Sequence, residues 1–135
     1  MQVIVYSQDN GQVAVCYPTG ELPIEEVLAK DCPTGAIIVD ASELPQGEDE
    51  FFDAWELNGT TVTVNLAKAK EIKKQKLRAE RAPLLQAQDV AFQRALESGA
   101  DTTAIVAEKQ RLRDITQLAD QATTLDELKA ITVGA

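Results

Sequence analysis

The chain has 135 residues, 44% of them hydrophobic, and a formal net charge of -9. A chain of this length forms one ordinary domain, or one small domain with an appendage, and buries only a modest core, which argues against a large active-site cleft. It has no histidine, so the commonest general base and zinc ligand is missing. With no signal peptide and no apolar run near the ~20 residues of a membrane span, the sequence predicts a soluble protein made in the cytoplasm.

Two short runs rich in β-branched and aromatic residues open the chain, at residues 3–6 and 13–17. The sequence DNG at residues 9–11 lies between them and supplies the positive φ angles that a tight turn needs. This pattern predicts a β-hairpin. Pro23 and two acidic residues after it then predict a short helix over residues 23–30, because proline suits the first helical turn and the helix dipole favours acids there.

A short buried strand is expected at residues 36–39, bounded by Gly35 and Pro45. The aromatic residues Phe51, Phe52 and Trp55 follow, spaced either as one helical turn or as the end of a loop. We expect their rings to anchor a core or an interface. Asn58-Gly59 marks a reversal before a last strand or extended arm at residues 61–64, so residues 1–64 are expected to form a small acidic α+β module.

Helix-forming residues dominate residues 65–97. Pro83 interrupts this run, so the helix is either kinked there or ends near Arg81 with a new helix beginning at Pro83. Gly99 ends the helical run and Asp101 caps the next one. A loop this short brings the two helices together antiparallel, which predicts a hairpin of about 83–97 against 102–119. The residues expected to face inward are Leu84, Leu85, Ala91, Phe92, Ala95 and Leu96 in the first helix and Ile105, Leu112, Ile115 and Leu118 in the second.

The last helix is predicted by a capping box, Thr124 to Glu127, followed by apolar residues up to Ile131. The fold class is therefore α+β: a small module containing a β-hairpin, then a long basic helix and a helical hairpin with a short last helix. The expected division is 1–64 for the acidic module, 65–82 for a basic helical connector and 83–135 for the helical hairpin region. Residues 65–80 offer few apolar positions, so we expect the connector to be gripped by other polypeptides.

Charge is divided unevenly along the chain. Residues 1–60 hold one base and twelve acids, whereas residues 68–81 hold seven bases and two acids. The basic run is interpreted as a solvated helix face, as a nucleic-acid-binding segment, or as a helix that docks on an acidic patch such as 43–56 of another subunit. Nucleic acid is not favoured, because no aromatic residue interleaves the run to stack on a base. The charges expected to dock are Lys70, Lys73, Lys74, Arg78 and Arg81.

The sequence lacks patterns typical of a catalytic or metal site. Cys16 and Cys32 form no C-x-x-C motif and are interpreted as core thiols rather than as a zinc or redox motif. The acidic segment GEDEFFDAWE lacks the alternating ligands and central glycine of an EF-hand loop. No phosphate-binding glycine loop and no nucleophile elbow is present. We therefore predict a protein that is not an enzyme, has no cofactor or metal, and acts in binding and assembly.

Several phrases of the sequence resemble a known group of proteins. These are DNGQVAVCYP, AIIVDASELP and DAWELNG, followed by the helical stretch at residues 76–116, which runs from KLRAERAPLLQAQDVAFQRALESG to KQRLRDIT. Together they cover most of the chain and are similar to small tail-region proteins of tailed bacteriophages and prophages, related to tail fibre assembly proteins. The usual "GD" after the first hairpin helix is here Gly99-Ala100-Asp101.

The resemblance implies a non-catalytic protein that acts in tail or tail fibre assembly or attachment and binds a phage tail or tail fibre protein. Two roles are open: an assembly chaperone that departs, and a permanent virion component such as a collar, adaptor or fibre-attachment ring. We expect a homo-oligomer in the host cytoplasm during assembly, with the virion tail as the site of a permanent component. An alternative of another class is a nucleic-acid-binding phage regulator.

Overall fold

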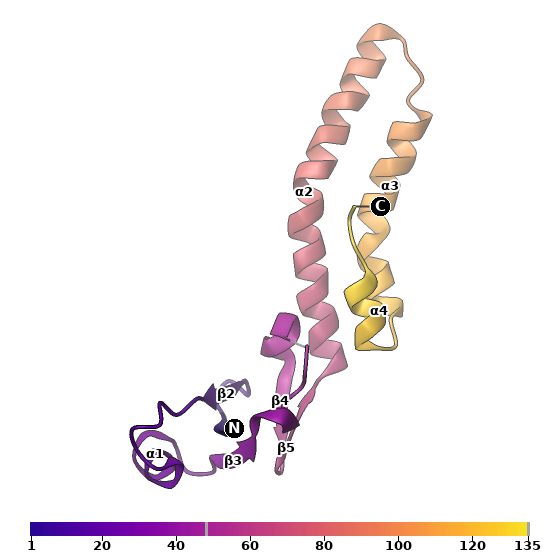
Figure 1. Cartoon of the computed structure of the whole chain (residues 1–135). Helices are drawn as coiled ribbons and strands as arrows, with labels where there is room; N and C mark the ends of the chain where they lie inside the picture. The colour runs from indigo at the N-terminus through magenta and orange to yellow at the C-terminus, as the bar shows by residue number, and fades with distance from the viewer. Residues whose placement is uncertain (48, 135) are drawn as a thin grey trace. The chain divides into compact units, whose positions relative to one another are not determined.

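The computed structural model describes residues 1–47 and 49–134 and confirms the α+β fold class. The chain divides into two compact units, Met1–Ala69 and Lys70–Ala135. The first unit contains all the strands shown in Figure 1 and the second is helical. The division into 1–64, 65–82 and 83–135 is one of composition and stays a prediction.

A three-stranded antiparallel sheet organises the first unit. Its central strand is β1 (Gln2–Ser7), which pairs with β2 (Val13–Cys16) on one side and with β3 (Ile37–Asp40) on the other. The predicted N-terminal hairpin is therefore confirmed. In its loop, the Gln8 N–H donates to the Gln12 carbonyl at 2.8 Å, and Gly11 takes a φ of 83°, the left-handed conformation that glycine adopts without strain.

Each face of this sheet is covered by a different element. Alternate residues of a strand point to opposite faces, so Val3 and Val5 share one face and Ile4 lies on the other. Val3 and Val5 join a buried cluster with Trp55 and Val62, which come from the two-stranded hairpin of β4 (Trp55–Asn58) and β5 (Thr61–Val64). Helix α1 (Ile24–Asp31) contacts β1 and β3 on the face of Ile4. The sheet therefore forms the middle layer of the unit.

Two short 3₁₀ segments, η1 (Ala41–Glu43) and η2 (Asp49–Ala54), lead from β3 to β4. The strand β4 is absent from the sequence-based expectation, which has only a loop or helical turn there. The reversal expected at Asn58-Gly59 is confirmed: Asn58 pairs with Thr61 across a two-residue loop, and Gly59 has a φ of 63°.

Asn65 and Glu56 join β4 to the start of the long helix α2 (Leu66–Ser98). The Asn65 side chain accepts a hydrogen bond from the Lys68 N–H at 3.0 Å, which caps the helix, and donates to Glu56 Oε1 at 2.9 Å. Lys68 Nζ lies 3.0 Å from the same carboxylate oxygen. These hydrogen bonds, the one from Lys68 first, lower the pKa of Glu56 below its ordinary value of 4.5.

We expect Glu56→Gln to reduce stability at neutral pH and to lose its effect in acid. The pKa of Glu56 is lower in the folded state than in the unfolded state, so its charged carboxylate stabilises the fold when the pH is above the unfolded-state pKa. This stabilisation is lost as the pH falls through the folded-state pKa. The measurement is the difference in thermal unfolding midpoint between the two proteins as pH is lowered. Glu43→Gln makes the same charge change at an exposed position and controls for net charge. A difference that stays constant into acid contradicts the assignment.

Helix α2 is one continuous element of 33 residues, so it does not end at Pro83. Proline removes one backbone donor and leaves the carbonyl four residues earlier, that of Ala79, without its helical partner. Both Ala79 and Pro83 are exposed, so water can bind this carbonyl, and the helix continues. The proline therefore lies on an exposed side of the helix, where the lost backbone hydrogen bond destabilises the helix least.

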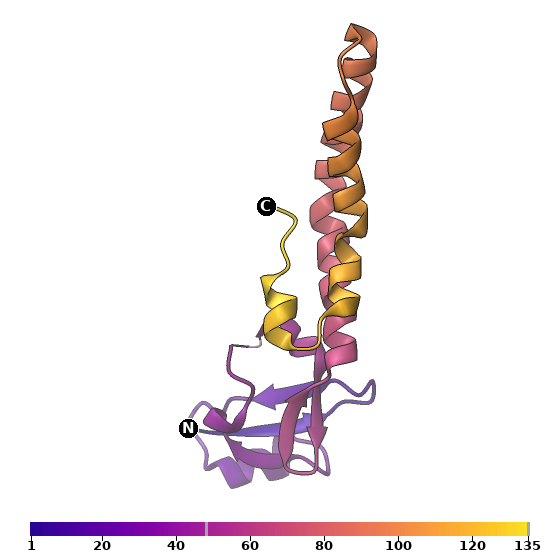
Figure 2. The ribbon, with the colours of Figure 1, turned by 90° about the vertical axis from the view of Figure 1, so that its right-hand side faces the viewer.

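The second unit is a helical hairpin built from residues 70–98 of α2 and from α3 (Thr103–Gln121), with a short helix α4 (Leu125–Ala130). Figure 1 shows α2 and α3 side by side, and Figure 2, seen from the side of α3, shows α3 in front of α2. The turn between them is closed at Gly99 (φ 71°), where the Ala100 N–H donates to the Ala95 carbonyl at 2.8 Å. The hairpin is longer than the predicted pairing of 83–97 with 102–119, because it includes most of the basic run.

The inward face of this hairpin differs in part from the prediction. Leu112 and Ile115 are buried as expected, but Leu118 is 48% exposed and Ala119 is buried in its place. Leu84 and Leu96, expected to face inward, are 39% and 60% exposed. A sequence pattern counts every leucine as apolar and does not distinguish one that faces the other helix from one next to the contact. Where two helices approach closely, a small residue such as Ala119 is favoured.

The predicted cap of the last helix is confirmed. Thr124 Oγ1 accepts a hydrogen bond from the Glu127 N–H at 3.1 Å. The Glu127 carboxylate reaches back to the Thr123 N–H at 2.7 Å, one residue earlier than in the usual capping box. Over residues 1–47 and 49–134, no helix is both long enough and apolar enough to cross a bilayer.

Candidate functional site

The three aromatic residues expected to act as anchors lie in different environments. Phe51 is fully buried. Trp55 is 3% exposed and belongs to the cluster that includes Val3 and Val62. Phe52 is 37% exposed, and its ring lies 4.9 Å from the Trp55 ring at a tilt of 54°. Phe51 and Trp55 therefore serve the core, whereas Phe52 presents an exposed edge while covering Trp55. Their binding of a partner stays a prediction.

Two lysines of the basic run bind the end of α3. Lys74 Nζ lies 3.0 Å from Asp120 Oδ1 and 3.2 Å from Glu71 Oε1, and the Lys74 side chain is only 16% exposed. The hydrogen bonds to Asp120 and then to Glu71 raise the pKa of Lys74. Lys70 Nζ donates to the backbone carbonyl of Asp120 at 3.1 Å. Both ammonium groups thus attach α2 to the C-terminal end of α3, at the end of the hairpin opposite its turn.

Arg81 also bonds within the hairpin. Its Nη1 donates to the carbonyls of Leu112 and Arg113, at 3.2 Å and 2.9 Å. Further toward the turn, Lys109 Nζ lies 2.7 Å from Asp89 Oδ1 and 5.1 Å from the centre of the Phe92 ring. Charged groups therefore cross-link the two helices along most of their length.

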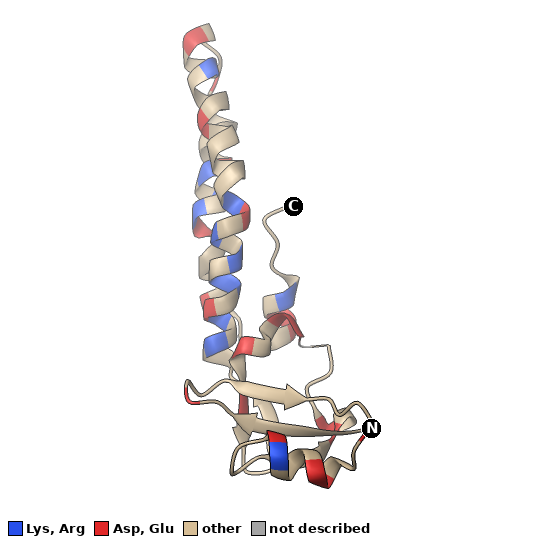
Figure 3. Cartoon of the chain, turned by 90° about the vertical axis from the view of Figure 1, so that its left-hand side faces the viewer, with Lys and Arg blue, Asp and Glu red and all other residues tan. Residues whose placement is uncertain are grey.

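The remaining two predicted docking charges differ in exposure. Lys73 is 4% exposed and has an interaction within the chain, whereas Arg78 is exposed. Figure 3 shows basic residues interspersed with acidic ones along the helical hairpin, and scattered acidic residues in the first unit. Residue 48, in the predicted acidic patch 43–56, lies outside the described residues. Docking of the five charges on a partner stays a prediction. Of these five, only Arg78 could bind a partner without breaking one of the contacts described above.

Sequence reasoning missed the acidic partner of the basic run. Asp120 lies 46 residues from Lys74, and no local pattern joins them. The available signal was the turn at Gly99, because residues at similar distances on either side of an antiparallel turn meet. Lys74 stands 25 residues before Gly99 and Asp120 stands 21 residues after it.

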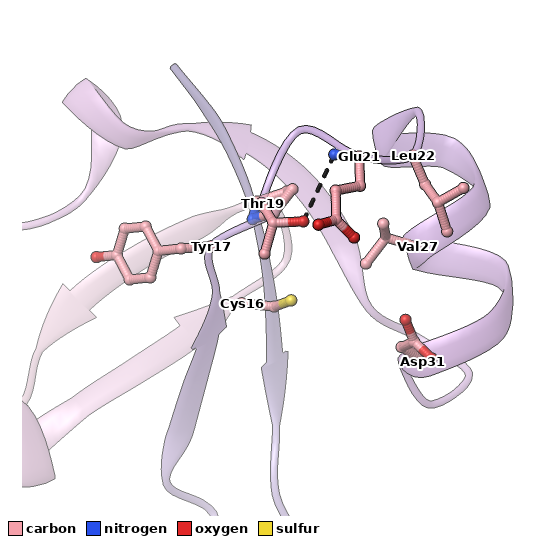
Figure 4. Close-up of a pocket in the computed structure, with 8 residues that line it drawn as sticks. Cys16, Tyr17, Thr19, Glu21, Leu22, Val27 and Asp31 are labelled. Atoms are coloured by element: carbon pink, nitrogen blue, oxygen red, sulfur yellow. Dashed lines mark hydrogen bonds between the residues drawn. The ribbon is translucent and has the colours of Figure 1, made fainter.

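A pocket of about 250 Å³ lies in the first unit between the end of β2, the loop that follows and α1 (Figure 4). It is smaller than the roughly 300–1,000 Å³ of usual ligand sites. The side chains that line it are mixed, with one thiol, two carboxylates and several apolar groups: Cys16, Tyr17, Pro18, Thr19, Glu21, Leu22, Val27 and Asp31. Tyr17 and Leu22 at this site are 59% and 44% exposed.

A metal centre has no candidate among the described residues, where no three His, Cys, Asp or Glu side chains gather closely enough to hold an ion. Comparison with known protein families, with curated proteins and with solved structures finds no match for this chain. Among the residues predicted to bind a partner, Phe52 in the first unit and Arg78 in the second are exposed.

Proposed function

We propose that this chain is a non-enzymatic bacteriophage tail-associated protein that acts in tail or tail fibre assembly or attachment through protein–protein contacts. The proposal rests on the likeness of residues 76–116 to tail-region proteins and on one structural observation. The hairpin pairs several of its own charges across its two helices, yet it leaves large apolar side chains on its outer surface. These are Leu84, Val90, Leu96, Val106 and Leu118, which are 39–60% exposed.

These apolar residues matter because of where they lie. A single exposed leucine on a protein surface is ordinary. Here Leu96 and Val106, 60% and 50% exposed, stand on either side of the turn at Gly99, one on each helix. The end of the hairpin thus exposes apolar area on both helices. This supports a surface that binds a tail or tail fibre protein over one that only faces water.

The partner contact and the role are tested together by quantitative mass spectrometry of purified virions and of tail intermediates from the same lysate. Copies in mature particles assign the protein to the virion, as a collar, adaptor or attachment ring. Copies on a defined tail or fibre protein in the intermediates alone assign it to a chaperone. Absence from both contradicts the proposal. Leu96→Lys is expected to reduce either association, with Gln93→Lys on the same exposed turn as the matched charge control.

We also propose that the chain forms a homo-oligomer, with the acidic first unit of one copy meeting an exposed basic group of another. The first unit carries twelve acids and two bases, whereas the second carries ten acids and eleven bases. Light scattering after size-exclusion chromatography tests this. We expect a multiple of the chain mass that falls with added salt, because such contacts are screened. The mass of a single chain at all concentrations contradicts the oligomer.

Binding of nucleic acid is the alternative from another class. Its support is weakened by the bonds of Lys70, Lys74 and Arg81 to α3, because each would have to break or be shared before a phosphate could be neutralised. The test is retention on DNA at low salt. Retention that is lost in the exposed-site variant Arg78→Glu would favour the regulator, and passage through the column at low salt would dispose of it.

A further inference from the structure

The two cysteines of the chain meet on one face of the sheet in the first unit. Cys16 is the last residue of β2 and lies opposite Ile4 of β1, which in turn lies opposite Ile38 of β3. Strand alternation therefore places Cys16 on the face that α1 covers. Cys32 is the residue at which α1 ends. Fold topology thus brings together two residues with fifteen others between them in the sequence.

Three further observations describe this pair. Cys16 lines the same pocket as Asp31, the residue next to Cys32, and, besides burial, Cys16 is one of the groups that raise the pKa of the Cys32 thiol, so the two thiols lie near each other. Both cysteines are free and half-buried. Figure 4 shows the Cys16 sulfur on the side of Val27 and Asp31, the α1 residues that line the pocket there. A half-buried pair is reached by small thiol reagents, unlike a pair sealed in a core.

We propose that Cys16 and Cys32 form a reversible disulfide that fastens the C-terminal end of α1 to the end of β2. The oxidant is a small disulfide such as oxidised glutathione. One cysteine, as the thiolate, attacks a sulfur of the oxidant and expels a glutathione thiolate. The second cysteine then attacks the mixed disulfide and expels the other glutathione. Two protein thiols are oxidised, one disulfide is reduced to two thiols, and the protons pass to the leaving thiolates.

The surroundings of Cys32 set the rate of this exchange. Burial raises the pKa of the Cys32 thiol, and the adjacent Cys16 and Asp31 raise it further. The protonated thiol is therefore the resting form at neutral pH, and the exchange accelerates as pH rises toward the raised value. The resulting link fixes a wall of the pocket, because Cys16, Val27 and Asp31 all line it.

The test uses the full chain in a mixture of reduced and oxidised glutathione, folded and in denaturant. We expect the folded wild type to lose two hydrogen atoms in its intact mass and to give one linked peptide pair containing Cys16 and Cys32. We expect the equilibrium constant for forming the intramolecular disulfide to be about tenfold or more higher in the folded chain than in the denatured chain, because folding holds the thiols together. The midpoint of thermal unfolding of the oxidised protein is expected to rise by on the order of 10 °C.

The single variants Cys16→Ser and Cys32→Ser provide the controls. Each retains one thiol and is expected to give a glutathione adduct in place of the mass loss, with no rise in thermal midpoint. Three results on the folded wild type would overturn the proposal: two thiols that stay free, two glutathione adducts, or a disulfide between chains. Equal disulfide yields from folded and denatured chains would overturn it as well, because the fold would then contribute nothing to the pairing.

Discussion

Replacement of Leu112 by alanine is expected to lower the free energy of unfolding by about 2–5 kcal/mol. Leu112 lies in α3 and is fully buried, and its carbonyl accepts a hydrogen bond from Arg81 of α2. Its removal leaves a cavity in a narrow two-helix contact, where few neighbouring side chains can move to refill it. Chemical denaturation followed by far-ultraviolet circular dichroism measures the loss, since most of the regular structure is helical.

Leu118→Ala is the matched control for this prediction. It makes the same chemical change six residues later in the same helix, but Leu118 is 48% exposed. We expect a change within about 0.5 kcal/mol, as for other exposed sites. The sequence pattern places both leucines inward, so equal and large losses would support that pattern and contradict the packing described for the second unit.

Replacement of Phe51 by alanine is expected to cost about 3–5 kcal/mol. Phe51 is fully buried at the centre of the segment η2, and a phenyl ring buries more apolar area than any aliphatic side chain. The measurement is again the free energy of unfolding from denaturant titration. A loss below about 1 kcal/mol would mean that the ring is not needed by the folded chain, which would return Phe51 to the role of an interface anchor.

Phe52→Ala separates the two roles expected for these rings. Phe52 is 37% exposed and touches Trp55 at a ring distance of 4.9 Å, so we expect a smaller loss of about 1 kcal/mol. If Phe52 binds a partner, the same variant weakens association by more than it weakens folding. Comparison of the two adjacent phenylalanines therefore distinguishes a ring that holds the core from one that meets another protein.

Local signals in the sequence were enough for elements that are defined locally. The DNG turn, the cap at Thr124 and the glycine at position 99 each act through backbone geometry within a few residues, and each was found. Strand β4 was missed because Trp55–Asn58 carries two polar residues and stands beside acidic, loop-like sequence. Its strand state comes from pairing with β5 and from burial of Trp55, which are tertiary effects.

The basic run was interpreted as lacking the apolar surface to pack. The structure packs it with few buried apolar residues, Ala69 and Leu77, and several of its charged side chains add contacts with the chain. Asp120 holds Lys70 and Lys74, and backbone carbonyls of α3 hold Arg81. An apolar count does not detect contacts of this kind, because their energy depends on the register of two helices rather than on the composition of one.

The cysteine pair shows the same limit. Motif reasoning looks for two cysteines at close spacing, and Cys16 and Cys32 do not meet that criterion. Their proximity follows from the antiparallel register of β1 with both of its neighbours and from the point at which α1 ends on the sheet. Strand register and the position of α1 on the sheet are tertiary properties, which local patterns in the sequence do not predict.

Residues 70–81 of the basic run are packed in the helical hairpin of their own chain, and under the proposed function a partner meets the outer apolar residues of the hairpin instead. Amide hydrogen exchange of the isolated protein, resolved by residue, tests this most directly. We expect amides of the run to be protected as strongly as those of α3, with loss of protection when Asp120 and Leu112 are replaced together. Exchange of residues 70–81 at the rate of an unstructured peptide, beside a protected α3, would contradict the claim.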